Sequence, residues 1–144
     1  MSKTLLYRLF RIGRVNRPER DRLASEGIAC LLEGIPLTIA WRDFRQAGRR
    51  VNSHQQNTTG AVAFTRERLR VYACSKPVLD VGLTDPTADR VTVTCPKPNT
   101  LAIRLQAQDF QPDASGQITY WLLTTEAAGL ADLWQQRGTA VADR

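Results

Sequence analysis

The chain has 144 residues, of which 42% are hydrophobic and 24% charged, and its formal net charge is +6. This length suits one domain with its own core, and the composition excludes a disordered or low-complexity protein. No apolar run approaches the ~20 residues of a membrane span, and Arg8 and Arg11 interrupt the N-terminal apolar stretch where a signal peptide would need continuity. We therefore expect a cytoplasmic protein, with peripheral attachment to a membrane as a further option.

The positive charge is concentrated in the first third of the chain. Residues 1–50 hold eleven Lys/Arg and five Asp/Glu, whereas residues 51–144 hold nine of each. Most of these cations are arginines, which pair bidentately with phosphate or carboxylate groups. An anionic partner would therefore meet the N-terminal part.

The first predicted element is a basic amphipathic helix in an extension over 1–27. Apolar residues recur at helical spacing over 4–15, with arginines on the opposite side. Such a helix either packs on its own domain or lies on an anionic membrane, where the arginines supply attraction and the apolar face inserts. The residues expected to bind lipid or a partner here are Leu5, Arg8, Leu9, Phe10, Arg11 and Arg14.

From residue 28 onward the apolar period changes to two, which predicts short strands with one face on a core. The expected strands are 28–32, 37–41, 60–64, 69–73, 79–83, 91–95, 101–105 and 118–122. Short polar links at 65–68 and 96–99 and the absence of helix-length segments between strands favour an antiparallel sheet or barrel.

Two longer links interrupt the strands, at 44–58 and 106–115. The first is polar, lacks periodicity and carries Arg45, Arg49 and Arg50, which we interpret as a second candidate contact for phosphate groups; a purely solvated loop is the alternative. A strand edge beside this loop is a further expected contact, where a partner strand would add.

The last predicted element is a closing helix over 125–137. Thr124 or Thr125 can cap it, Gly138 can end it, and Ala127, Leu130 and Trp134 share one face. This apolar stripe must cover part of the β domain, which we place at 28–138. Residues 139–144 are expected to form a frayed tail.

The succession of strands closed by one amphipathic helix resembles the pleckstrin-homology-like superfold. Residues 59–72, with an apolar strand, a Thr-Arg-Glu-Arg turn and a second strand, are similar to a hairpin of GRAM and bacterial pleckstrin-homology-like domains. Segments 33–35, 43–45 and 110–116 resemble an uncharacterised bacterial family. The resemblance implies an antiparallel barrel or curled sheet capped by a C-terminal helix, and it implies no activity.

Residues that carry chemistry are sparse. Cys30, Cys74 and Cys95 are far apart, no CxxC occurs, and His54 is the only histidine, so we expect no metal site, no cofactor and no catalytic centre. Each cysteine is interpreted as a small buried apolar side chain. The protein is therefore predicted not to be an enzyme.

The function predicted from the sequence is a non-catalytic binding module. Its partner is a protein, a second copy of the chain, or an anionic membrane surface. Two alternatives stay open: a small molecule held inside the barrel, and nucleic acid bound by the basic N-terminal third. Positive charge by itself is a weak signature of nucleic-acid binding, so that alternative ranks last.

Overall fold

The computed structural model describes Pro18, Asp21, Ser25 and residues 27–142. Pro18, Asp21 and Ser25 are helical and exposed. The amphipathic helix expected over 4–15, with its six candidate contact residues, lies outside the described residues.

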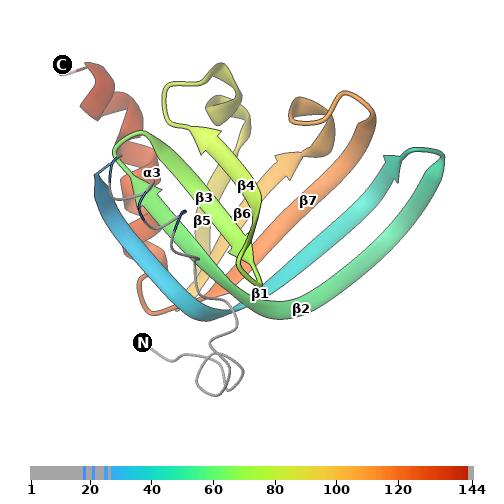
Figure 1. Cartoon of the computed structure of the whole chain (residues 1–144), viewed down its shortest axis with the longest axis horizontal. Coiled ribbons are helices and arrows are strands. Elements are labelled where there is room, and N and C mark those ends of the chain that lie inside the picture. The colour runs from blue at the N-terminus through green and yellow to red at the C-terminus, as the bar shows by residue number, and fades with distance from the viewer. Residues whose placement is uncertain (1–17, 19–20, 22–24, 26, 143–144) are drawn as a thin grey trace.

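The chain is mainly β, as predicted, and forms one antiparallel sheet that curls without closing (Figure 1). The strand order is β4-β3-β2-β1-β7-β6-β5, so β4 and β5 are the edge strands. The strands are β1 (Ile28–Gln46), β2 (Arg49–Thr65), β3 (Arg68–Ala73), β4 (Lys76–Gly82), β5 (Thr92–Lys97), β6 (Thr100–Gln106) and β7 (Ala114–Leu123). Two 3₁₀ turns, η1 (Pro86–Arg90) and η2 (Ala107–Asp109), follow β4 and β6.

The first two expected strands are one long strand, β1. The pairing of β1 with β2 shifts register between Glu33 and Ile35, and Gly34 has a φ of 69°, a left-handed conformation that glycine adopts without strain. This bulge carries the strand through a bend that alternation patterns did not anticipate. From Leu37 onward β1 also pairs with β7, so it joins the two halves of the sheet.

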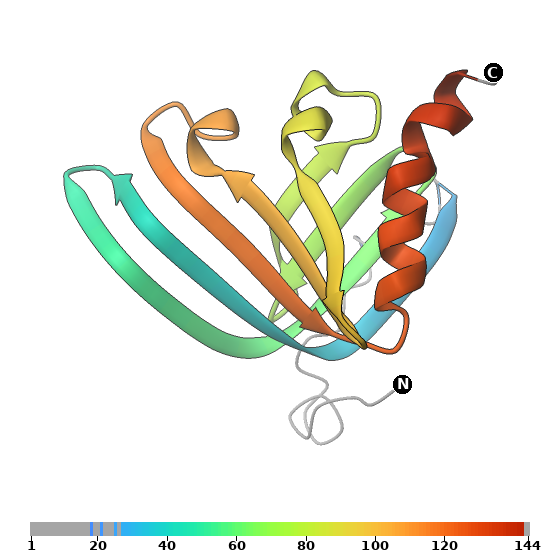
Figure 2. The same ribbon diagram turned by 180° about the vertical axis from the view of Figure 1, so that it is seen from behind.

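The concave face of the sheet carries the main core, and α3 (Ala127–Ala142) covers one end of it (Figure 2). Trp134 is 2% exposed and meets Phe64 edge to face, with ring centroids 6.3 Å apart. The hydroxyl of Thr124, one of the two residues expected to cap the helix, accepts a hydrogen bond from the Glu126 N–H (3.2 Å) in the turn just before α3. The helix runs past its expected end at residue 137 and includes the glycine expected to stop it.

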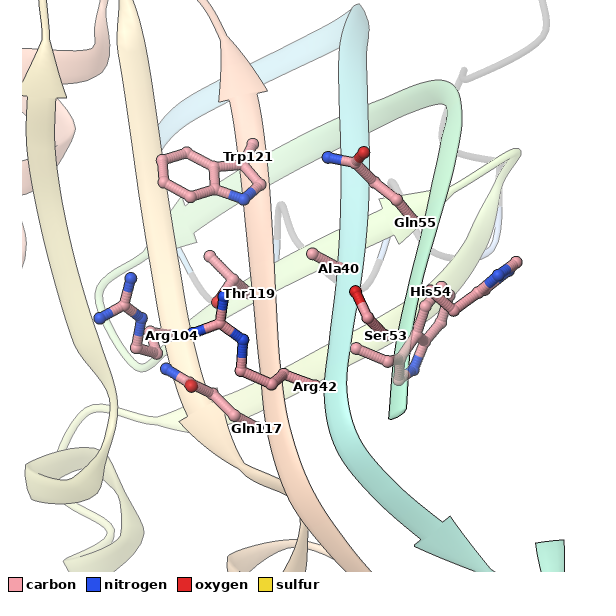
Figure 3. A pocket seen from close by; sticks show the side chains of 10 residues that line it. Ala40, Arg42, Ser53, His54, Gln55, Arg104, Gln117, Thr119 and Trp121 are labelled. Carbon is pink, nitrogen blue, oxygen red and sulfur yellow. The ribbon is translucent and has the colours of Figure 1, made fainter. Parts of the chain in front are cut away.

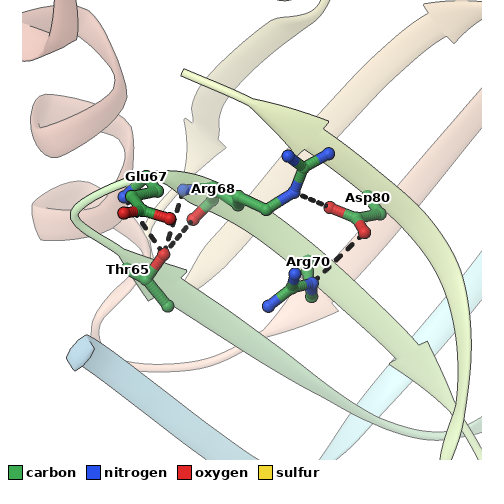
Figure 4. Close-up of polar contacts among 5 residues, drawn as sticks. All are labelled: Thr65, Glu67, Arg68, Arg70 and Asp80. Carbon is green, nitrogen blue, oxygen red and sulfur yellow. Dashed lines mark hydrogen bonds and ion pairs between the residues drawn. The ribbon is translucent and has the colours of Figure 1, made fainter. Parts of the chain in front are cut away.

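Part of the convex face is also buried, which the alternation pattern did not predict. Ala61, Ala63 and Tyr72 form a second buried cluster there. Beside them Arg70 is 1% exposed, and its Nε lies 3.3 Å from Asp80 Oδ2 on the neighbouring strand (Figure 4). The other carboxylate oxygen of Asp80 accepts a hydrogen bond from Arg68 Nε (2.5 Å), so one aspartate serves two arginines.

The cysteines depart from their expected burial. Cys30 and Cys95 are half-buried and pack against the main core, but Cys74 is exposed, with a φ of 50° in the turn between β3 and β4. All three are free thiols. Cys74 sits at the end of its apolar segment, where the chain turns away from the core.

Candidate functional site

The segment expected to be a polar loop, 44–58, is the distal part of a β-hairpin. β1 continues to Gln46 and β2 begins at Arg49, joined only by Ala47 and Gly48. Both turn residues have positive φ, 51° and 77°, the geometry of a tight two-residue hairpin turn. Residues 52–57 are all exposed, so neither face of β2 requires apolar residues there. The sequence therefore has no apolar and polar alternation that would predict this part of the strand.

A bulge fixes this hairpin to β7. The pairing of β1 with β7 shifts between Arg42 and Arg45, and Asp43 has a φ of 52°. Opposite the bulge, a Cβ on Gly116 would lie 2.5 Å from the Asp43 carbonyl oxygen. Only glycine permits this close approach of the two backbones.

The outer side of β2 has no neighbouring strand from the described residues along its distal half. β3 pairs with Gly60–Phe64, and the last bond in that direction is the Cys74 N–H donating to the Thr59 carbonyl (3.0 Å). Residues 49–58 pair only with β1 in the described chain, and most of them are exposed. We call residues 49–58 the free edge; its outward N–H and C=O groups are available to another chain.

Three predicted site residues converge at the end of this hairpin. Arg45 and Arg50 are cross-strand partners, and Arg49 faces Gln46. All three arginines are exposed and none forms an ion pair with a described residue. Like charges directly opposite on a sheet repel each other, so this end of the hairpin favours an anionic partner.

The contrast with Arg90 supports this reading. Arg90 Nη1 donates to Asp109 Oδ1 (2.7 Å) and joins η1 to η2. Arg90 is therefore an exposed arginine with an ion-pair partner, unlike the three hairpin arginines. The hairpin arginines line a depression whose one carboxylate is that of Asp113, just before β7, and this carboxylate is not within ion-pair distance of them.

A concave groove of about 370 Å³ lies at the end of the core that α3 leaves open. Its lining is largely aromatic and aliphatic, including Trp41, Phe44, Phe110, Ile118 and Tyr120. This groove is where the alternative expectation of a small molecule in the barrel would apply, and that expectation stays a prediction.

Among the described residues, the depression that His54 lines contains no Asp, Glu or Cys side chain. His54 is exposed on β2, and its ring lies 5.3 Å from that of Trp41 at 30°. Within the described ranges, no three His, Cys, Asp or Glu side chains are grouped so that they could hold a metal ion. The described part of the chain also includes no helix with the length and apolar character needed to cross a membrane.

No protein-family model matches the chain, and no curated protein is similar to it in sequence.

Proposed function

We propose that the chain is a non-catalytic, pleckstrin-homology-like binding module whose free edge accepts an extended segment of a protein partner. The seven-strand order and the helix that follows β7 support the proposed superfold. The observation that carries the proposed function is the free edge itself, a run of about ten residues that pairs with β1 on one side and with no described strand on the other.

The chemistry of the edge fits strand addition. Main-chain groups on the outer side of β2 supply affinity in such complexes, and side chains beside them supply specificity. Long exposed edges are usually blunted by proline, lysine or an inward charge, and residues 51–58 contain none of these. The arginines at one end favour a partner segment with acidic residues at the matching end.

Proline substitutions test this proposal, because successive residues of a strand direct their main-chain groups to opposite sides. Of the N–H groups of Ser53 and His54, one points to β1 and the other points outward from the free edge. One of the two proline variants should therefore unfold the hairpin, while the other should keep the melting temperature and lose partner binding.

The readout is hydrogen exchange of the full chain, alone and with proteins captured from lysate. Outward-facing amides of residues 49–58 should exchange fast in the isolated chain and become protected on binding. Molecular mass measured over a dilution series shows whether the partner is a second copy of the chain. Binding that persists in the folded proline variant would refute strand addition.

The second candidate is an anionic membrane surface, favoured by the three exposed hairpin arginines. Flotation with vesicles containing phosphatidylserine should then fall with salt and with the variant Arg45→Gln/Arg49→Gln/Arg50→Gln. The matched control, Arg66→Gln/Lys76→Gln/Lys97→Gln, removes the same charge elsewhere and should float like the wild type. A parallel variant, Arg8→Gln/Arg11→Gln/Arg14→Gln, measures the share of the N-terminal extension.

A further inference from the structure

A separate depression of about 300 Å³ lies on the convex face of the sheet, across β1, β2, β6 and β7 (Figure 3). Strand alternation places most of its lining side chains opposite to those of the core: Trp121 and Thr119 point outward, whereas Tyr120 and Leu122 point inward. This outer depression is distinct from the hairpin arginines and from the free edge. The sequence predicted none of its residues as a binding site.

Two arginines flank the middle strand of the depression. Arg42 on β1 is paired with Gln117, and Arg104 on β6 is paired with Thr119, so the two flank β7 from opposite sides. Figure 3 shows Arg42 reaching over β7 in the direction of Arg104. Thr119 between them is only 6% exposed.

These guanidinium groups lack a counter-ion in the described chain. Both arginines are exposed, neither forms an ion pair with a described residue, and the lining of the depression contains no carboxylate. Two positive charges held over one strand repel each other unless an anion lies between them. A charge of two matches the dianion of a phosphate monoester better than a single carboxylate, and guanidinium groups bind phosphate bidentately.

The depression also offers a flat apolar surface next to the charges. The half-buried indole of Trp121 is paired with Thr38 and Ala102, and its broad face is turned toward the viewer in Figure 3. Both neighbours have small side chains, and tryptophan faces stack on planar rings. Gln55 and Ser53 supply neutral hydrogen-bonding groups on the opposite side.

We propose that this outer depression binds a phosphate monoester of a planar ring, with Arg42 and Arg104 holding the phosphate and Trp121 contacting the ring. Its volume is at the lower end of the range for small-molecule sites, which suits a ligand the size of a nucleoside monophosphate.

The test titrates the full chain with adenosine monophosphate, adenosine and inorganic phosphate, by calorimetry and by amide chemical shifts. We expect the monophosphate to bind at least about tenfold more tightly than either fragment and to shift the amides of Ser53, Gln117 and Trp121. The variant Arg42→Gln/Arg104→Gln should weaken binding about tenfold or more, and Trp121→Leu should reduce the preference for the monophosphate over phosphate.

The control variant Arg45→Gln/Arg49→Gln/Arg50→Gln should leave this affinity unchanged, which separates the outer depression from the proposed hairpin contacts. Absence of binding at millimolar monophosphate, shifts confined to other residues, or inorganic phosphate that binds as tightly as the monophosphate would each overturn the proposal. The shift map of the unaltered chain decides the question even where a variant does not fold.

Discussion

The hydroxyl of Tyr120 donates a hydrogen bond to the main-chain carbonyl of Val78 (3.1 Å), which joins β7 to the edge strand β4 across the concave face. The two residues are 42 positions apart, and no strand pairing connects their strands directly. This bond links the two halves of the unclosed sheet where backbone pairing does not. Burial raises the pKa of Tyr120 to about 12.

Tyr120→Phe should lower the free energy of unfolding by about 1 kcal/mol, since one buried hydrogen bond is lost with little change in volume. The pKa shift adds a pH dependence. The unfolded phenol ionises near pH 10, whereas the folded one stays neutral until about pH 12, so stability is complete below pH 10 and is lost as pH rises toward 12. Denaturant titrations over this window should show about 2 kcal/mol of loss in the wild type that Tyr120→Phe does not show.

Gly116→Ala should destabilise the chain by about 2 kcal/mol or more, because the new Cβ would collide with the Asp43 backbone at a φ of 110°. Gly48→Ala is the matched control. It also has a positive φ, but nothing lies within 4 Å of its Cβ, so only about 1 kcal/mol is expected. Equal losses in urea melts would mean that the bulge accommodates a side chain.

Ala47→Asn should stabilise the hairpin by roughly 0.5–1 kcal/mol. Alanine is strained at a φ of 51°, whereas an Asn-Gly pair suits both central positions of this turn. Thermal melts would measure the gain, and slower hydrogen exchange at residues 44–51 would locate it. A lower melting temperature would contradict the assigned turn geometry.

Asp80→Asn should cost about 2 kcal/mol, because it removes a charge partner from Arg70, which is 1% exposed. This loss is below the usual cost of a broken buried pair because the Asp80 side chain is 34% exposed and therefore screened by solvent. Arg68→Gln breaks the other contact of Asp80 at a more exposed position and should cost less than about 1 kcal/mol. Chemical denaturation of both variants ranks the two contacts, and a larger loss for Arg68→Gln would reverse this assignment.

Thiol reagents should modify Cys74 first and Cys30 at least about tenfold more slowly at pH 8. Cys74 is exposed, whereas burial raises the pKa of the Cys30 thiol and the negative charge of Glu126 raises it further. Peptide mass spectrometry after timed labelling measures both rates. Glu126→Gln should speed the Cys30 reaction slightly and leave Cys74 unchanged.

Local chemistry made much of the fold predictable from sequence. Alternation located most strands, and the polar link at 65–68 forms the expected turn, in which the Thr65 hydroxyl accepts a hydrogen bond from the Arg68 N–H (2.9 Å; Figure 4). The stripe containing Leu130 and Trp134 correctly indicated a helix with a buried face. These features depend on neighbours close in sequence, so periodicity and turn residues report them.

The hairpin and the outer depression required tertiary structure. Residues 52–57 are exposed on both faces, so their strand is stabilised by pairing with β1 and leaves no hydrophobic pattern. Arg42 and Arg104 are 62 positions apart and line the same depression only because β7 pairs with both β1 and β6. The sequence by itself determined the mainly β class, the closing helix and the surplus of arginine. Strand order decided which arginines lie together, because pairing between strands distant in sequence depends on the whole sheet.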